Sequence, residues 1–547
     1  MPPRFRRPEP MTTFELVPDD ERDEHPASPD GDDGDDGAAR RLRAAVRDRA
    51  AERWRRLSRR ARVAVSAGTA VVLLACATAA AAPALLDARA ERLRAETVHG
   101  LPGAVDDLSE PLTVTWEVED GNGILTTFPD GVALTSDGTH VWALDVAAGK
   151  ELWRQDLGPD PTCGPSAHTP VDVAAPVDVV VCLTGDPDDR TVTVLDATGA
   201  VVGERQIGPA RDDPYLESVD GDVPLVLPAA DGAVAVVDHL PSGISAPWVE
   251  EGSEEDDATT LRALRAEGWV DPTLRLEDAV TGEVRAEVTA PLRPEHLRGC
   301  NRIYETVDGE NEVSVRAVSS VEATPSFTVL WACGASAGLT ADGTPLDAPT
   351  SGGWPQALAG GGYVLTADES SVLATDGSVV ATVHGWVYPP TVDADPGGPY
   401  LTAAGLDEGT GGVRLSAVGP DGRRDWGVET DEFSGVLARV AGTVVVQDGD
   451  RAVGLDAATG AELWARDGLL DRSGDGSGEW VAGVLTDGTR LLVGVNGDGA
   501  GHRLVTLDAR DGTTVWERAG EGPVTALQAV DGQPVLLGST LRGLGLR

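Results

Sequence analysis

The sequence predicts an all-β fold, an eight-bladed β-propeller in which four-stranded antiparallel blades stand around a ring. Three near-copies of one ten-residue segment are the main reason, and they lie at Leu144–Trp153, Leu455–Trp464 and Leu507–Trp516. Each reads as a strand, a tight turn and a second strand, and such repeats are typical of propellers and solenoids. One small sheet cannot bury its own apolar faces, whereas a ring of sheets buries them and leaves only short edges.

Each copy carries an aspartate before the turn, a glycine in it and a tryptophan after it. The aspartate carboxylate can accept hydrogen bonds from backbone N–H groups just downstream, and the glycine can adopt a positive φ. We expect the tryptophan to fill the gap between one blade and the next. The residues that carry this blade docking are Asp145, Gly149 and Trp153, Asp456, Gly460 and Trp464, and Asp508, Gly512 and Trp516, together with Trp116 and Trp426.

Five weaker hairpins occupy the spaces between the strong copies, which makes eight hairpins across residues 110–520. They lie at 195–199, 276–284, 339–346, 373–379 and 417–426. The segment Leu112–Val118 resembles an outer strand without a hairpin partner, and residues 534–546 resemble inner strands without an outer one. We therefore expect the two chain ends to meet in one sheet. A strict count then gives nine blades, but propellers typically have four to eight. We accordingly predict eight, within a range of seven to nine, and take one hairpin near 233–290 or 336–347 as an insertion.

The pattern Ala143-x-Asp145-x-x-Ala148-Gly149-Lys150-x-x-Trp153 resembles the tryptophan-docking repeat of the pyrroloquinoline quinone (PQQ) family of β-propellers. The resemblance covers residues 110–547. That family includes quinoprotein alcohol dehydrogenases, a non-enzymatic outer-membrane-assembly lipoprotein and membrane-anchored actinobacterial proteins. The resemblance implies the blade architecture. It does not by itself imply a bound quinone.

The charge of the chain excludes nucleic acid as a partner. The 547 residues include 44 basic and 90 acidic side chains, which gives a net charge of −46. Residues 1–62 hold 15 Arg against 14 acidic residues, so almost all of the negative charge lies beyond residue 62. Such a field repels phosphates and keeps a protein soluble.

Residues 63–86 form a stretch of 24 residues without a charge, and as a helix they would span roughly 36 Å. That length suffices for a hydrocarbon core of about 30 Å. Eleven Arg lie in residues 40–62, and the positive-inside rule places them in the cytoplasm. We predict a single-pass protein of the cytoplasmic membrane with the propeller outside. A cleaved leader, or lipidation at Cys76, are the alternatives.

The predicted domains follow this topology. Residues 1–39 are an acidic, Pro-rich disordered tail in the cytoplasm. Residues 40–62 form a basic juxtamembrane helix, and residues 63–86 form the transmembrane helix. Residues 87–110 form a stalk, and residues 111–547 form the propeller.

Four cysteines lie beyond the predicted membrane span, and an oxidising compartment favours disulfides between them. Cys163 and Cys300 each precede a strand pair, and Cys182 and Cys333 each end a strand. Because this relation occurs twice in equivalent parts of the repeat, we predict the pairs Cys163–Cys182 and Cys300–Cys333. Four buried free thiols are the alternative.

No catalytic set stands out in the sequence. The segment Gly334–Gly338 matches a nucleophile elbow, but turn and strand sequence follows where a helix is needed, so we interpret it as blade sequence. The eight His are scattered. Asp471, Ser473, Asp475 and Glu479 space oxygens as a Ca²⁺ loop does, but the bidentate carboxylate of an EF-hand is missing, so a polar loop is favoured over a metal site.

These observations predict a non-catalytic binding or scaffolding propeller that holds a protein or cell-envelope ligand on its face loops, with no cofactor. The connections 240–272, with a short helix expected at 259–267, and 296–326 are the candidate loops. One alternative is a quinoprotein-type oxidoreductase, which would need PQQ and Ca²⁺ at the ring centre, and no Cys-Cys pair like that of many such dehydrogenases is present. Another alternative is a sensor that passes an outside signal to residues 1–39.

Overall fold

The computed structural model describes residues 100–547, apart from 120, 122, 211–222, 240–243, 248–253, 267, 300, 308–309, 317–318, 347–354, 367–368, 406–411, 472–477, 498–500 and 547. These residues belong to one compact unit, Ala88–Arg547. The predicted tail, juxtamembrane helix and transmembrane helix lie outside the described residues. Within the described residues, no helix is long and apolar enough to cross a membrane.

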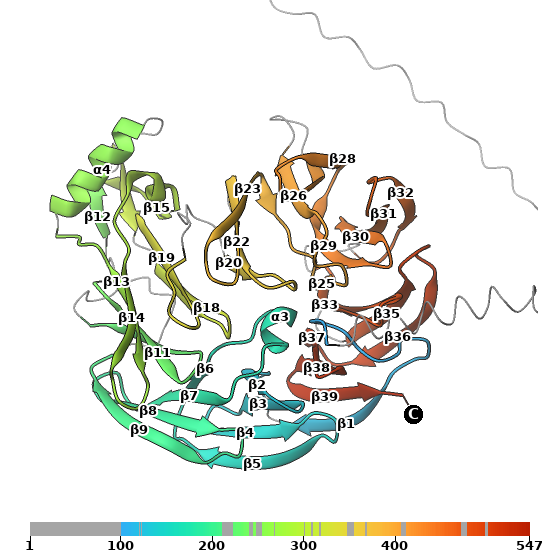
Figure 1. Ribbon diagram of the computed structural model, residues 1–547, viewed down its shortest axis with the longest axis horizontal. Coiled ribbons are helices and arrows are strands. Elements are labelled where there is room, and N and C mark those ends of the chain that lie inside the picture. Colours follow the sequence, from blue (N-terminus) through green and yellow to red (C-terminus); the bar gives the residue numbers. More distant parts are fainter. Residues whose placement is uncertain are drawn as a thin grey trace, which may run out of the picture. The chain divides into compact units, whose positions relative to one another are not determined.

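The described strands form a ring of nine blades, so the prediction of eight is wrong (Figure 1). Ten sheets are present among the described residues, and one of them is an insertion outside the blade pattern. All eight hairpins found in the sequence connect the outer two strands of a blade, and the joined chain ends make the ninth. The strict count was therefore correct, and no hairpin had to be removed.

Blades 1 to 3 follow the chain from the first hairpin. Blade 1 contains β2 (Thr126–Phe128), β3 (Val132–Ser136), β4 (His140–Asp145) and β5 (Lys150–Asp156). Blade 2 contains β6 (Thr162–Gly164), β7 (Val179–Thr184), β8 (Arg190–Asp196) and β9 (Val201–Gly208). Blade 3 contains β10 (Leu225–Ala229), β11 (Ala233–Asp238), β13 (Thr273–Asp278) and β14 (Val284–Thr289).

Blades 4 to 6 continue around the ring. Blade 4 contains β17 (Ser319–Ala323), β18 (Phe327–Ala332) and β19 (Ala335–Thr340), and an isolated bridge joins Leu339 to Pro345. Blade 5 contains β20 (Pro355–Ala357), β21 (Tyr363–Leu365), β22 (Glu369–Leu373) and β23 (Val379–His384). Blade 6 contains β24 (Trp386–Val387), β26 (Tyr400–Gly405), β27 (Val413–Val418) and β28 (Arg424–Thr430).

Blades 7 to 9 complete the ring. Blade 7 contains β29 (Phe433–Val440), β30 (Thr443–Asp448), β31 (Arg451–Asp456) and β32 (Glu462–Arg466), with β25 (Val392–Asp393) added parallel to β29. Blade 8 contains β33 (Trp480–Thr486), β34 (Arg490–Asn496), β35 (Gly501–Asp508) and β36 (Thr514–Glu521). Blade 9 contains β37 (Val524–Val530), β38 (Gln533–Gly538), β39 (Thr540–Gly545) and β1 (Thr113–Glu119).

Blade 9 confirms that the two chain ends meet in one sheet. The outer strand β1 pairs antiparallel with β39, from Thr113 opposite Gly545 to Glu119 opposite Thr540. Residues 100–110, expected as part of a stalk, lie against the propeller. Val105 donates its N–H to the carbonyl of Thr486 at 2.8 Å, and the side chain of Leu108 is fully buried.

The insertion lies inside and after blade 3, and its first part falls in the range 233–290 suspected from the sequence, although the hairpin of that range belongs to a blade. Between β11 and β13 the chain forms β12 (Ile244–Pro247) and α4 (Glu254–Ala266), which contains most of the helix expected at 259–267. After β14 it forms the 3₁₀ helix η1 (Pro294–Gly299), β15 (Asn301–Val307) and β16 (Glu310–Arg316). Strands β12, β16 and β15 make a separate three-stranded sheet. The two connections singled out in the sequence therefore fold together.

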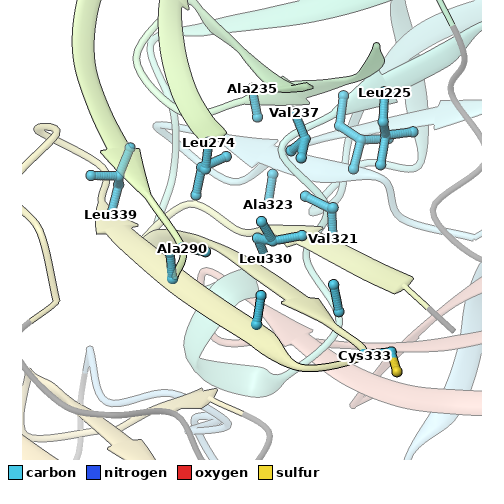
Figure 2. Packing of buried hydrophobic residues seen from close by; sticks show 14 of the residues in the cluster. Leu225, Ala235, Val237, Leu274, Ala290, Val321, Ala323, Leu330, Cys333 and Leu339 are labelled. Atoms are coloured by element: carbon cyan, nitrogen blue, oxygen red, sulfur yellow. The ribbon is translucent and has the colours of Figure 1, made fainter. Parts of the chain in front are cut away.

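Apolar side chains fill the interfaces between blades. Figure 2 shows the interface of blades 3 and 4, where Leu225, Val237 and Leu274 of one blade face Val321 and Leu330 of the other. This cluster consists mainly of aliphatic residues. Burial of such side chains stabilises a fold by about 25 cal/mol per Å² of apolar surface removed from water.

The disulfide between Cys163 and Cys182 is confirmed and joins β6 to β7. Cys333 is also disulfide-bonded. Cys300 lies outside the described residues, so the pairing of Cys300 with Cys333 stays a prediction.

Candidate ligand-binding face

Tryptophans connect neighbouring blades by one repeated contact. The indole N–H of Trp153 in blade 1 donates to the carbonyl of Ala197, the residue after the turn aspartate Asp196 of blade 2, at 2.8 Å. The same bond joins Trp116 to Val146, Trp426 to Ala457, Trp464 to Ala509 and Trp516 to Leu108, at 2.7 to 3.0 Å. The predicted docking role of these five tryptophans thus has a defined geometry.

The turn glycines make room for the indole rings. Gly149 has a φ of +63°, and a Cβ placed on it would lie 2.2 Å from Cγ of Trp116. Gly460 lies under Trp426 and Gly512 under Trp464 in the same way. Glycine is needed here both for the positive φ and for the close approach of the ring.

The carboxylates of the turn aspartates accept hydrogen bonds within their own hairpins. Oδ1 of Asp145 accepts from the N–H of Ala148, and Oδ1 of Asp508 accepts from the N–H of Arg510. Oδ1 of Asp456 accepts from the backbone N–H groups of residues 458 and 459 and from the hydroxyl of Thr459. The Thr459 hydroxyl is the main reason why the pKa of Asp456 is lowered.

Among the described residues, tryptophan docking occurs in part of the ring. The five bonds run from blade 6 through blade 9 to blade 2. At the interface of blades 2 and 3, Nε of Arg205 donates to the carbonyl of Ala279. The position in blade 2 that corresponds to Trp153 of blade 1 is Gly203, which packs against Val280. Blades 3 and 5 have alanine there, at Ala286 and Ala381. The aliphatic cluster of Figure 2 lies in this part of the ring.

The candidate Ca²⁺ loop is only partly described. The carboxylate of Glu479 receives bonds from Nη2 of Arg503, at 2.7 Å, and from the backbone N–H of Asp471, also at 2.7 Å. Ser473 and Asp475 lie outside the described residues. Within the described residues, no group of three or more His, Cys, Asp or Glu could hold a metal ion. Glu479 forms an ion pair with Arg503, and the loop as a whole stays a prediction.

Two other polar groups have structural roles. Ser336 lies in β19, which confirms that the elbow-like segment is blade sequence.

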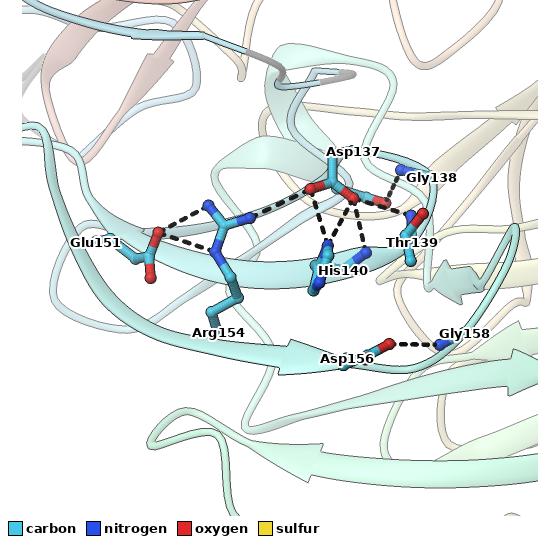
Figure 3. A network of polar contacts seen from close by, with 9 residues as sticks. Asp137, Gly138, Thr139, His140, Glu151, Arg154, Asp156 and Gly158 are labelled. Carbon is cyan, nitrogen blue, oxygen red and sulfur yellow. Dashed lines mark hydrogen bonds and ion pairs between the residues drawn. The ribbon is translucent and has the colours of Figure 1, made fainter.

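In blade 1, Asp137 accepts from the backbone N–H groups of Thr139 and His140 and pairs with Arg154 (Figure 3). The backbone bond from His140 is the main cause that lowers the pKa of Asp137. This network fixes the turn between β3 and β4.

The ring centre is crossed by residues 165–178, the connection between β6 and β7, which we call the plug segment. It carries the short helix α3 (Pro170–Val173), which lies near the middle of the ring in Figure 1. Ser166 donates to the carbonyl of Ala323 in blade 4, and Ala167 and Val177 donate to carbonyls of Leu125 and Thr127 in or beside blade 1. The segment is therefore fixed to two blades that are not neighbours in the ring.

Two carboxylates approach each other beside the plug segment. Asp172 of α3 is 2% exposed, and its Oδ2 accepts from the hydroxyl of Thr169 at 2.7 Å, whereas its Oδ1 has no hydrogen-bond partner. Burial raises the pKa of Asp172. Burial, and then repulsion from Asp172, raise the pKa of Glu322 in β17 to about 7.

The described residues at the ring centre do not fit a quinone held by Ca²⁺. The plug segment occupies the place where the resemblance would put the quinone, and Asp172 and Glu322 are the carboxylates there that have shifted pKa values. A PQQ–calcium site needs several carboxylate and amide oxygens around an open cavity. We therefore derive no catalytic step through such a cofactor.

A pocket of about 520 Å³ opens beside the plug segment, and we call it the mouth pocket. Its walls come from residues 100–106, from turn residues 127–131 of blade 1, from residues 529–532 of blade 9, from the plug segment and from Asp487. It lies on the face that carries the turns between the first and second and between the third and fourth strands of each blade, which we call the turn face. In blade 1 the N–H of Val146 donates to the carbonyl of Gly131, so these two turns meet.

Sequence reasoning missed both the plug segment and the mouth pocket. One signal was available for the plug, because residues 165–178 separate two strands that most other blades join by short turns. The pocket is built from five separate parts of the chain, and no local pattern marks such a site.

The fold and the docking bonds define the class of protein: a β-propeller whose blades are joined by tryptophans on the turns of the next blade. Residues 411–545 match the protein family described as outer membrane protein assembly factor BamB. The chain is thus a β-propeller, and residues 411–545 carry repeats of the PQQ-like type. A search of the curated proteins found no match.

Solved structures of several functions are similar to the chain. The structure of BamB from Moraxella catarrhalis is 14% identical, with a TM-score of 0.36, over 80% of this chain and 100% of that chain. The quinohemoprotein alcohol dehydrogenase ADHIIG from Pseudomonas putida HK5 is 14% identical, with a TM-score of 0.30, over 80% of this chain and 76% of that one. The dihydro-heme d1 dehydrogenase NirN is 14% identical, with a TM-score of 0.29, over 80% and 81% of the two chains.

Proposed function

We propose that the protein is a non-catalytic binding or scaffolding propeller, anchored in the cytoplasmic membrane by residues 63–86, that holds a partner on its turn face outside the cell. The observation that carries the proposal is the arrangement at the ring centre. The plug segment fills the place of a central cofactor, and the mouth pocket opens beside it with about 520 Å³ of space. Ligand pockets commonly have volumes of 300–1,000 Å³.

The rigidity of the ring supports a binding role. The plug segment is closed at its base by the Cys163–Cys182 disulfide and is bonded to blades 1 and 4. A pocket on such a support changes little in shape when a ligand binds, so little binding energy is lost in ordering the site. This differs from the loops 240–272 and 296–326, which fold into the separate insertion sheet.

Site-specific photocrosslinking in intact cells tests the proposal. A photoreactive amino acid would replace Pro129, an exposed pocket residue on the turn face, or Trp480, which is 51% exposed at the far end of its strand. We expect one discrete adduct from position 129 and none from position 480. Adducts of equal yield at both positions, or none at 129, would contradict a partner on the turn face.

Quinone binding is tested separately by the melting temperature of the full chain in detergent. A ligand that binds only the folded state raises this temperature by mass action. We expect no rise with PQQ and Ca²⁺ together. A clear rise accompanied by quinone-dependent oxidation of an alcohol would replace the proposal by the oxidoreductase alternative.

A further inference from the structure

The charged side chains that line the mouth pocket are all carboxylates: Asp106, Asp130, Asp487 and Asp531. Asp487 is buried and bonded to the N–H of Leu108 and to Arg490. The other three are exposed. Within the described part of the chain, these three carboxylates take no part in any hydrogen bond or ion pair. Their negative charge is therefore available to a ligand.

The three exposed carboxylates lie side by side along one rim. Gly131 follows Asp130 in its turn, and a Cβ built on Gly131 would lie 3.3 Å from Oδ2 of Asp531. A Cβ built on Gly532, the next residue after Asp531, would lie 3.9 Å from Oδ1 of Asp106. Blades 9 and 1 and the segment before β1 thus bring together three negative charges that are far apart in the sequence.

The wall below this rim is apolar. It is made by side chains from the entering segment, from blades 1 and 9 and from the plug segment, namely Leu101, Val105, Phe128, Val173 and Val530. A ligand that fits both parts has an apolar stem and a cationic head. Arginine and lysine side chains have this form, since their methylene chains pack on apolar surface while the charge stays at the rim.

We propose that the mouth pocket binds an arginine side chain of a basic peptide segment on the partner protein. This rests on the proposed function and names the chemistry of the partner. The planar guanidinium carries five N–H donors in a fixed arrangement and matches carboxylate pairs better than the compact ammonium of lysine does. The acidic surface of the whole chain also favours the approach of a basic segment.

The Asp-Gly turn that contains Asp130 also occurs outside the pocket, and that second turn supplies a matched control. Asp130 and Asp531 have φ values of +63° and +47° and each precede a glycine, and Asp-Gly is a preferred hairpin turn of this kind. Asp231 of blade 3 has the same turn with a φ of +54°, is exposed and does not line the pocket. Asparagine tolerates this conformation as aspartate does, so each Asp→Asn change keeps the turn.

Calorimetric titration of the full chain in detergent tests the inference, with the peptide Ac-Ala-Arg-Ala-Arg-Ala-NH₂ and its citrulline counterpart as probes. We expect the arginine peptide to bind, and the citrulline peptide to bind at least about tenfold more weakly, because charge-assisted bonds are lost. In the double variant D130N/D531N the Kd of the arginine peptide should rise by about tenfold or more. D231N should leave its Kd within about twofold.

Several outcomes would overturn the inference. They are equal Kd values in D130N/D531N and D231N, equal binding of the two peptides, and no binding up to millimolar peptide. Displacement of the peptide by Ca²⁺ that itself needs Asp130 and Asp531 would make the pocket a metal site. Binding of agmatine as tight as that of the peptide would indicate a small cationic ligand. A turn-face photoadduct that persists in D130N/D531N would sink this inference and leave the proposed function standing.

Discussion

Trp516 donates its indole N–H to the carbonyl of Leu108, 408 residues earlier in the chain, at 2.8 Å. In the other docked blades the acceptor belongs to a hairpin turn, but blade 9 has no such hairpin because β39 and β1 are the two ends of the propeller. The segment before β1 takes the place of that turn. Leu108 is fixed in turn by the bond from its N–H to Asp487. The segment before β1 is therefore part of the docking system.

Replacing Trp516 by phenylalanine should destabilise the propeller by about 1–2 kcal/mol. The ring volume is largely kept, but the buried carbonyl of Leu108 loses its donor. Urea unfolding followed by circular dichroism measures the change. The control is W480F, because Trp480 is half-exposed, and there we expect a change within about 0.5 kcal/mol. Equal midpoints for the two variants would show that the bond contributes nothing.

Replacing the glycine under a docked tryptophan by alanine should destabilise the protein more than the same change at a turn glycine without close neighbours. Gly149 and Gly422 both have positive φ values, +63° and +75°, so alanine at either costs about 1 kcal/mol in backbone strain. Only at Gly149 does the new Cβ collide with a ring, that of Trp116, because nothing lies within 4 Å at Gly422. We expect G149A to cost at least about 1 kcal/mol more than G422A in the same unfolding assay. Similar losses in both would contradict the packing argument.

Stability should fall between pH 5 and pH 8 because of Glu322. Its pKa is raised by burial, and then by Asp172, to about 7 in the folded protein, against 4.5 as its ordinary value. The folded state therefore holds this proton more tightly than the unfolded state. The resulting stabilisation is full below about pH 4.5 and is lost as the pH rises through about 7. Its upper limit is roughly 3 kcal/mol.

The variant E322Q measures this contribution, since glutamine stays neutral throughout the range. We expect the free energy of unfolding to fall less between pH 5 and pH 8 in E322Q than in the wild-type protein. E462Q, at an exposed position in β32, is the control and should follow the wild type. If the free energy of unfolding of E322Q fell with pH as steeply as that of the wild type, another group would be responsible for the pH dependence.

Removal of the Cys163–Cys182 disulfide should destabilise the protein by about 3 kcal/mol, since it closes a loop with a sequence separation of 19 residues. That loop is the plug segment, so its opening should also be more frequent. Hydrogen exchange of the Ala167 and Val177 amides, compared in the wild type and in the double Cys→Ala variant, reports this opening. Unchanged protection of these amides would show that the blade contacts alone hold the plug.

Local features of the fold could be predicted from the sequence. The hairpin at Asp456, Gly460 and Trp464 is specified within ten residues, because turn, positive φ and docking ring follow one another along the chain. The pairing of β1 with β39 was also predictable, because each end of the repeat array lacks its complement. These features depend on residue types at fixed spacing.

The strict count of hairpins and chain ends gave nine blades, but the packing of the weak blades and the site could not be read in the same way. Blades 3 and 5 carry Ala286 and Ala381 where others carry tryptophan, so their interfaces depend on aliphatic packing that has no fixed spacing in the sequence. The plug is positioned by bonds to Leu125 and Ala323, which belong to different blades. The pocket requires all of these to be in place. Contacts between distant residues decide each of these features.

The join between β1 and β39 has a consequence for the newly made chain. β1 is synthesised first among the strands and its partner last, and at 5–20 residues per second the 408 residues from Leu108 to Trp516 take roughly 20–80 s. During that time the edge of β1 has no partner strand. We expect chaperones to bind this region while the chain emerges, and truncation after residue 520 to leave a fragment prone to aggregation.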